Sequence, residues 1–386
     1  MPALEPLPPV DLRHVELVTA RLALARPVAT SRGVRSGRDV LLVHVVADQA
    51  EGWAECVAEP EPTYGPEFAA GAALVLADHL IPRIPSARAD ATSSLGPALD
   101  GVRGHRMARA ALELAVLDAQ LRAAGRSLAG WIGATAATVP AGATVGMADD
   151  LDALVAEVAE VVRLGAARVR CKVAPGRTAA LAAIRAAHPA LVLQADANGG
   201  FDPADEAHRA ELRALDELGL ACLEQPFGPD DLVAHGALAR ELATPLCLDE
   251  SITSPGTLAS ALALGACRVL CLKPGRVGGW VAARRLHDRA VEAGLGVWVG
   301  GMFETGLGRA ANLAVAALPG ITAPGDFDPR GWFAPDLVGR PADADDPVGS
   351  PDPVGLVVPT GPGTGVVPDP AVLADATIGR VAAWPA

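Results

Sequence analysis

Five charged residues follow one another at nearly even intervals, each at the end of a short apolar stretch typical of a β-strand. They are separated by 24, 28, 25 and 24 residues and comprise Lys172, Asp196, Glu224, Asp249 and Lys273. One strand, one helix and two short loops fill about that length, so the spacing predicts a repeated strand–helix unit. In a barrel of parallel strands, all carboxyl ends of the strands meet at one mouth. We therefore expect three carboxylates and two ammonium groups to face one another there.

The pattern from residue 138 onward predicts a modified (β/α)7β TIM barrel, because strand-like and helical segments alternate. The eight expected strands are Val139–Val145, Arg168–Val173, Leu191–Asp196, Leu220–Glu224, Pro245–Asp249, Arg268–Lys273, Leu295–Val299 and Ile321–Phe327. The interval after most of them carries a helical pattern, for example at Asp205–Leu218 and Gly279–Ala293. The fold class expected is α/β.

The first part of the chain predicts a different, α+β module. Apolar residues alternate over His14–Leu24 and Asp39–Ala47, whereas Gly104–Ala124 is strongly helical and is followed by Gly125. The last part is rich in Asp, Pro and Gly but keeps apolar residues as far as Trp384, so we prefer a return segment over a disordered tail. We expect three regions: a capping domain at 1–133, a barrel at 134–340 and a return segment at 341–386 that packs on the capping domain.

Composition restricts the partners of this protein. The 386 residues carry a formal net charge of −13, which offers no basic face to a nucleic acid or an anionic membrane. The N-terminus lacks the basic and apolar regions of a signal peptide, and no uninterrupted apolar stretch approaches the length of a membrane span. We expect a cytoplasmic protein and a homo-oligomer that binds a small-molecule carboxylate.

Three of the six cysteines, Cys222, Cys247 and Cys271, each stand two residues before one of the charged strand ends. Side chains alternate along a strand, so these thiols share the inward face one layer deeper in the barrel. We interpret them as small apolar filling of the interior. The alternative is a thiol metal site.

The three acidic strand ends predict a metal ion. A single acid after a strand commonly caps the following helix, and that interpretation is open for each one alone. Three carboxylates at consecutive strand ends would repel one another in a partly desolvated mouth unless a cation bound them. Ligation by oxygen alone favours Mg²⁺, with Mn²⁺ as a substitute, over Zn²⁺. Asp196, Glu224 and Asp249 are therefore the expected metal ligands.

The two lysines predict base catalysis. A lysine at a strand end is commonly a solvated surface charge, but Lys172 and Lys273 share the face of the acids. Proximity to a dication and to each other should lower their pKa values and make a neutral amine available as a base. Their strands, the second and sixth, lie on opposite sides of the barrel. A carboxylate substrate bound at the metal would therefore present its α-carbon to one lysine on each face.

The ordered set of five residues resembles the enolase superfamily, and its two lysines are similar to those of the muconate-lactonising subgroup. No histidine stands at the seventh strand end, where Leu295–Val299 leads into Gly300. Finer motifs resemble the family of o-succinylbenzoate synthases and N-succinylamino acid racemases. These motifs are Lys273–Gly279, Gly300–Arg309, the capping-loop segments Pro27–Arg38 and Pro62–Tyr64, and the C-terminal Thr360–Gly365.

The resemblance implies a Mg²⁺-dependent carbon–oxygen lyase. It would dehydrate 2-succinyl-6-hydroxy-2,4-cyclohexadiene-1-carboxylate in menaquinone biosynthesis, with N-succinylamino acid racemisation as a second activity. Lys172 would be the base, and Lys273 would stabilise the enolate or act as the base on the opposite face. Further residues expected to bind substrate or support the site are Tyr64, Ser31, Arg170, Asn198, Glu250, Arg276, Gly301, Met302 and Glu304.

Two departures from the family pattern keep a rival open. The usual Lys-x-Lys of the second strand reads Arg170-Cys171-Lys172, and the eighth strand ends in Asp326-Phe327-Asp328. An Asp-x-Asp at this place also marks dipeptide epimerases, where it holds a substrate ammonium. A dipeptide epimerase, or another two-lysine racemase or cycloisomerase, is therefore the alternative. A noncatalytic binding barrel is a remote one, because all five polar groups are retained.

Overall fold

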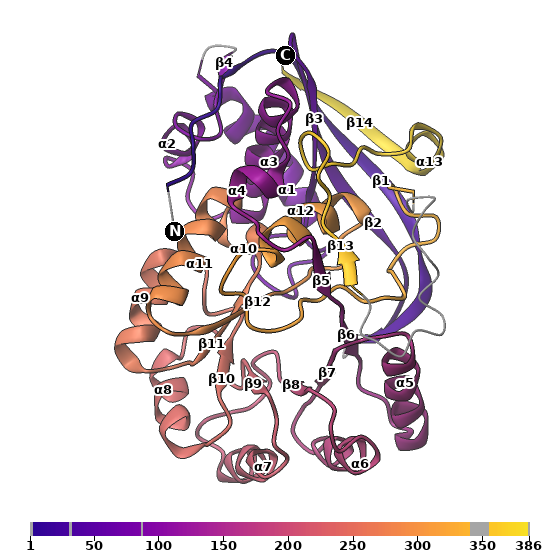
Figure 1. Cartoon of the computed structure of the whole chain (residues 1–386), viewed down its shortest axis with the longest axis vertical. Coiled ribbons are helices and arrows are strands. Elements are labelled where there is room, and N and C mark those ends of the chain that lie inside the picture. The colour runs from indigo at the N-terminus through magenta and orange to yellow at the C-terminus, as the bar shows by residue number, and fades with distance from the viewer. Residues whose placement is uncertain (1–2, 31–32, 86–87, 340–354, 385–386) are drawn as a thin grey trace.

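The computed structural model describes residues 3–30, 33–85, 88–339 and 355–384. It consists of a curved parallel sheet surrounded by helices and, beside it, a second sheet with its own helices (Figure 1). The expected α/β class is confirmed. Within the described residues, no helix is both long and apolar enough to cross a membrane.

The barrel sheet contains seven parallel strands in chain order. They are β6 (Gly142–Val145), β7 (Arg168–Lys172), β8 (Leu193–Asp196), β9 (Cys222–Glu224), β10 (Leu246–Leu248), β11 (Val269–Leu272) and β12 (Gly296–Val299). The helices that alternate with them are α5 (Leu151–Arg163), α6 (Ala179–Ala187), α7 (Glu206–Asp216), α8 (Leu232–Glu241), α9 (Pro255–Leu264), α10 (Pro274–Val277), α11 (Trp280–Glu292) and α12 (Gly306–Ala316). Figure 1 shows α5 to α9 on the outside of the curved sheet.

The segment expected as an eighth strand, Ile321–Phe327, is not a regular strand. It joins β12 through the backbone N–H groups of Thr322 and Asp326, and it joins the start of the barrel through one parallel bridge between Ala141 and Gly325. Pro324 lies in the middle of the segment, and a proline cannot donate a backbone hydrogen bond to a neighbouring strand. The segment therefore occupies the position of the eighth strand but forms few backbone hydrogen bonds to the strands on either side.

The expected first strand of the barrel is also shorter than predicted. Residues Thr138–Pro140 form a separate strand, β5, which pairs antiparallel with β13 (Gly355–Val357) near the C-terminus. Only Gly142–Val145 enters the barrel sheet. Pro140 is the last residue of β5, so the antiparallel pairing ends at a residue that lacks a backbone donor.

The second sheet has the strand order β14-β1-β2-β3. Its strands are β1 (Val10–Thr30), β2 (Gly33–Ala47), β3 (Glu51–Cys56) and β14 (Thr377–Trp384), and the short β4 (Arg88–Ala89) pairs with β1. The C-terminal β14 runs antiparallel to β1, so the end of the chain packs on this sheet. The boundaries of the three expected regions stay a prediction, and residues 340–354 lie outside the described part of the chain.

The helices of this second part begin with α1 (Ala69–Val75), which continues into a π-helical turn at Leu76–Leu80 and a 3₁₀ turn at Ile81–Arg83. The others are α2 (Leu95–Leu99), α3 (Arg106–Ala123), α4 (Leu128–Ile132) and α13 (Pro370–Ala376). Helix α3 is rich in Ala and Leu, and most of its residues are buried. It ends at Gly125, whose positive φ of 62° suits glycine.

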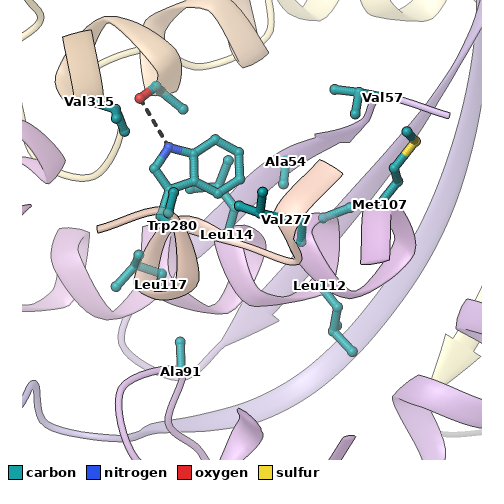
Figure 2. Close-up of a cluster of buried hydrophobic side chains, with 14 of the residues drawn as sticks. Ala54, Val57, Ala91, Met107, Leu112, Leu114, Leu117, Val277, Trp280 and Val315 are labelled. Carbon is teal, nitrogen blue, oxygen red and sulfur yellow. Dashed lines mark hydrogen bonds between the residues drawn. The ribbon is translucent and has the colours of Figure 1, made fainter. Parts of the chain in front are cut away.

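The two parts of the molecule share one hydrophobic core, in which α3 packs against α10 and α11 (Figure 2). Trp280 at the start of α11 contributes the largest side chain of this region, and its indole Nε1 donates to the carbonyl oxygen of Ala311 at 3.1 Å. Val277 of α10 and Leu114 of α3 lie beside it. Because α10 directly follows Lys273, this core fixes the second part of the molecule next to the mouth of the barrel.

Candidate active site

Three acids meet at the carboxyl ends of β8, β9 and β10. Asp196 and Glu224 are the last residues of β8 and β9 and pair in register, while Asp249 directly follows β10. All three have 0% exposure. The parallel register predicted from the spacing thus brings these carboxylates to one end of the sheet.

Lys172 and Lys273 contact this group of acids from opposite ends. Lys172 Nζ donates to Asp196 Oδ2 and to Asn198 Oδ1, both at 2.6 Å, whereas Lys273 Nζ donates to Asp249 Oδ2 at 2.8 Å. The side chain of Lys172 is 28% exposed and that of Lys273 only 5%. These two residues are the only lysines in the chain. Lys172 is therefore the amine that a ligand can reach, and Lys273 is enclosed.

The electrostatics of Lys273 differ from the expectation. Burial alone would lower the pKa of Lys273, but Tyr64, Cys271 and Glu250 outweigh it and raise the pKa above its ordinary value. The predicted lowering required a bound dication and a nearby ammonium, whereas the groups that contact Lys273 are oxygen and sulfur atoms. These neighbours therefore favour the protonated form of Lys273.

Arg170 contacts several of the acids from the interior of the barrel. Its Nη1 donates to both carboxylate oxygens of Glu224 at 2.9 and 3.0 Å and lies 3.3 Å from Asp196 Oδ2, while Nη2 donates to Asp326 Oδ2 at 2.6 Å. Burial would raise the pKa of Asp196, but Lys172 and Arg170 hold it below its ordinary value. For Glu224, burial dominates and raises the pKa, and the charge of Asp196 adds to the rise. The guanidinium of Arg170 thus neutralises only part of the negative charge of Asp196 and Glu224.

Asn198 and Glu250 extend the group toward solvent. Asn198 Nδ2 donates to Glu250 Oε1 at 2.9 Å, and Asn198 has a positive φ of 44°, a conformation that non-glycine residues rarely adopt. The other oxygen, Glu250 Oε2, is buried without a hydrogen-bond partner in the described part of the chain. Burial raises the pKa of Glu250, and the charge of Asp196 adds to the rise. Glu224 and Glu250 are both carboxylates whose ionisation an added cation would favour.

These residues fit a divalent cation. The donors are buried carboxylate oxygens, the ligands that a hard dication prefers. The orphaned oxygen of Glu250 and the raised pKa of Glu224 show unneutralised negative charge at the same place. By distance alone, the donor atoms gathered most closely belong to Glu224, Asp249 and Cys271, all within 4.8 Å of one another. Asp196 is turned toward Lys172 and Arg170 instead.

Tyr64 and Arg276 cover Asp249. Tyr64 comes from the loop after β3, and its hydroxyl contacts Asp249 Oδ2 at 3.2 Å, Lys273 Nζ at 3.1 Å and Arg276 Nη1 at 3.3 Å. Arg276 forms an ion pair with Asp249, and its Nη2 donates to the carbonyl oxygen of Cys271 at 2.8 Å. Two of the expected supporting residues therefore reach the Lys273 end of the site, one from each part of the molecule.

The loop after β12 lines the same mouth. A Cβ on Gly300 would lie 2.5 Å from Cys271 Sγ and 2.7 Å from Lys273 Cε, so this position requires glycine. The backbone N–H of Gly301 donates to Asp326 Oδ2 at 3.1 Å. Glu304 uses its carboxylate within the loop region, accepting from the backbone of Met302 at 2.8 Å and from Asn312 at 3.0 Å. Glu304 therefore shapes this loop, and Ser31 lies outside the described residues.

Two buried residues that hold this loop were absent from the sequence prediction. Arg38 Nη1 donates to the carbonyl oxygens of Met302 and Phe303 at 2.6 and 2.7 Å, and Glu55 Oε2 accepts from the backbone and hydroxyl of Thr305 at 2.9 and 2.7 Å. For Glu55, the available signal was a charged residue between the apolar residues Ala54 and Cys56, whereas Arg38 stands in a polar stretch and gave no such signal.

The interior below the acids agrees with the expected apolar filling. Cys222, Cys247 and Cys271 form a buried cluster with Trp298. All six cysteines of the chain are free. Arg168 and Arg170 lie over the Trp298 ring, at 4.6 and 5.2 Å from its centroid.

Comparison with known proteins gives matches along nearly the whole chain. The family model of the mandelate racemase / muconate lactonizing enzyme N-terminal domain matches residues 13–133, and the enolase C-terminal domain-like model matches 153–372. An N-succinylamino acid racemase from Amycolatopsis sp is 41% identical, with 96% of this chain and 99% of the relative covered. An o-succinylbenzoate synthase from Geobacillus kaustophilus is 37% identical, with coverage of 82% and 84%.

The fold has solved counterparts. The crystal structure of an enolase superfamily member of unknown function from Enterococcus faecalis V583 superposes with a TM-score of 0.87 at 34% identity, with coverage of 97% of this chain and 99% of that one. The resemblance inferred from the five charged strand ends is confirmed. The chain belongs to the mandelate racemase / muconate lactonizing enzyme family of the enolase superfamily.

Proposed function

We propose that this protein is an o-succinylbenzoate synthase that also racemises N-succinylamino acids. One observation carries the proposal: the only two lysines of the chain contact a group of three buried carboxylates from opposite ends. Both reactions begin with removal of the proton next to a carboxylate, so one site with two amines serves both. The relatives with these two names, at 41% and 37% identity, support the same pair of activities.

Lys172 is the base of the proposed reaction. It is the more exposed amine, and Asp196 and Asn198 orient its Nζ. In the dehydration, Lys172 takes the α-proton of the substrate, the bond from the β-carbon to its hydroxyl breaks, and the protonated Lys172 gives the proton to the departing hydroxyl, which leaves as water. The same residue thus acts as base and then as acid.

Lys273 acts on the opposite face. Its raised pKa keeps it protonated, so it stabilises the negative charge that develops on the substrate during dehydration. In racemisation, Lys172 removes the original α-proton and Lys273 donates its own proton to the α-carbon from the opposite face. This leaves Lys273 neutral and Lys172 protonated, and in that form the two residues exchange roles for the other enantiomer. Asp249 and the Tyr64 hydroxyl accept from the ammonium of Lys273 and hold it in place, and Arg276 donates to the same hydroxyl.

The proposed cofactor is Mg²⁺, with Mn²⁺ as a substitute. Asp196, Glu224 and Asp249 would hold it, because they are the buried acids at consecutive strand ends. The ion would supply positive charge that stabilises the carboxylate of the substrate as the α-proton leaves.

The rival dipeptide epimerase needs a free carboxylate in the segment after β12 for the substrate ammonium. Asp326 is instead paired with Arg168 at 2.8 Å and with Arg170 at 2.6 Å. Asp328 is paired with Arg26 at 3.1 Å and with Arg330 at 2.8 Å. Both carboxylates are nearly inaccessible, with side-chain exposures of 6% and 1%. These pairings favour a substrate without an ammonium group.

The test is the variant Lys172→Ala, assayed with both substrates. We expect dehydration to slow by ~10² to 10⁴, the range for loss of a general base, while the thermal unfolding midpoint stays near that of the parent. Arg177→Ala, five residues along and with a half-exposed side chain, is the matched control and should keep full activity. Near-normal dehydration by folded Lys172→Ala would refute the role of Lys172. Absence of α-proton exchange in D₂O for the parent protein would support a noncatalytic barrel instead.

A further inference from the structure

Cys271 lies where it can change the metal preference of the site. Its thiol and the carboxylates of Glu224 and Asp249 place three donor atoms within 4.8 Å of one another, and all three residues are fully buried. Among the described residues, this is the one group of three or more His, Cys, Asp and Glu donors gathered so closely. Asp196 does not belong to it.

Two overlapping donor sets therefore share Glu224 and Asp249. The set with Asp196 contains only oxygen and suits a hard ion. The set with Cys271 contains one sulfur and two oxygens, and a thiolate favours a softer ion such as Zn²⁺ or Cd²⁺. We propose that Cys271, Glu224 and Asp249 form a second, alternative site for a soft divalent cation. The proposal goes beyond the proposed reaction and does not depend on it.

The geometry is compatible with such a site. Zinc commonly takes three protein ligands and one open position, with bonds of about 2.0–2.3 Å, so donors now within 4.8 Å of one another would approach by roughly 1 Å. The sulfur of Cys271 lies close to Gly300, since a Cβ added at Gly300 would be 2.5 Å from it.

The surrounding cations weaken the attraction of the two carboxylates for a further cation. Arg170 donates to Glu224, and Lys273 and Arg276 contact Asp249, so the two carboxylates already have cationic partners. A soft ion bound through these oxygens alone would be held weakly. Cys271 adds one negative charge when it binds as a thiolate and releases its proton to the solvent, and this charge retains the ion.

The experiment is a titration of the reduced, metal-free, full-length protein with Cd²⁺ alone, followed by the ultraviolet charge-transfer absorption of a cadmium–thiolate bond. We expect the parent protein to develop this band with one equivalent of Cd²⁺. Cys271→Ser should lose the band and bind Cd²⁺ at least ~10-fold more weakly. Mutation of a residue that only contacts a metal ligand already lowers metal affinity by about this factor, and removal of a ligand should lower it at least as much. Excess Mg²⁺ should shift the parent titration to higher Cd²⁺ concentration, because both ions use Glu224 and Asp249.

Two controls identify the donor set. Cys247→Ser should keep the band, because the Cys247 sulfur accepts from Trp298 Nε1 and lies outside the group of three donors. Asp196→Asn should also keep it. Absence of the band in the parent, its persistence in Cys271→Ser, or its loss in either control would overturn the proposal. A ¹¹³Cd resonance of the parent protein in the oxygen-only range would overturn it without any variant.

Discussion

Glu55 is a buried acid that connects β3 to the loop beside the active site, and replacing it by Gln should change how stability depends on pH. Its Oε2 accepts from Thr305, while Oε1 has no hydrogen-bond partner among the described residues and lies 4.0 Å from Arg38 Nη1. Its side chain has 0% exposure. Burial, together with the charge of Glu304 and against the attraction of Arg38, raises the pKa of Glu55 from 4.5 to about 7.

The sign and size of the effect follow from this pKa. Between pH 4.5 and about 7, the unfolded chain has released the proton of Glu55 and the folded protein still holds it, so the free energy of unfolding falls as the pH rises. Each pKa unit corresponds to about 1.4 kcal/mol, so the rise from 4.5 to about 7 destabilises the folded protein by about 3 kcal/mol at high pH. Glu55→Gln keeps an acceptor oxygen but cannot titrate. Between about pH 4 and pH 8, the free energy of unfolding of the variant should therefore rise by about 3 kcal/mol relative to that of the parent.

The measurement is urea unfolding of both proteins at several pH values, followed by tryptophan fluorescence. The informative quantity is the difference between the two free energies of unfolding, because it cancels the titration of every other group. The matched control is Glu292→Gln, the same substitution at a carboxylate whose side chain is 71% exposed, so it separates the effect of burial from that of the substitution itself. A constant difference for Glu55→Gln would refute the reasoning.

Three further predictions concern the proposed chemistry. EDTA should abolish turnover and Mg²⁺ or Mn²⁺ should restore it, as measured by dehydration rate; full activity of the metal-free protein would contradict the metal assignment. Lys273→Arg keeps the charge but replaces an ammonium that can donate its proton to the α-carbon by a guanidinium that stays protonated, so it should lose racemisation far more completely than dehydration; equal losses would contradict the two-face argument. Arg170→Lys should lower the thermal unfolding midpoint, because an ammonium cannot reach Glu224 and Asp326 together; an unchanged midpoint would show that Arg170 is not needed to hold them.

The barrel and the position of its acids were predictable because they depend on local rules. Strand and helix lengths fixed the interval between Asp196, Glu224 and Asp249, and parallel pairing forces the ends of neighbouring strands to one side. The inward direction of Cys222, Cys247 and Cys271 followed from alternation along a strand. None of these inferences required knowledge of contacts between distant segments.

The features that the sequence did not predict depend on such distant contacts. The pKa of Lys273 is set by Tyr64, which arrives from a loop 209 residues earlier in the chain. The contact between Glu55 and Thr305 joins residues 250 positions apart. The irregular segment at 321–327 had a local signal in Pro324, but its apolar residues on either side suggested a strand. Side-chain environment, unlike strand order, is decided by the packing of the whole molecule.

Position 170 holds an arginine where the family pattern has a lysine, and this arginine helps to close the barrel. Closure needs such help because few backbone contacts join the last segment of the barrel to its first strand. The segment after β12 meets the first barrel strand through a single backbone bridge, so side chains must hold it in place. Arg168 and Arg170 of β7 both donate to Asp326, and their attraction outweighs burial and lowers the pKa of Asp326. Arg170 binds both acids because its terminal nitrogens are separate donors, with Nη1 toward Glu224 and Nη2 toward Asp326. The same residue therefore closes the barrel and positions an acid of the active site, which explains why Asp326 is not free to bind a substrate ammonium.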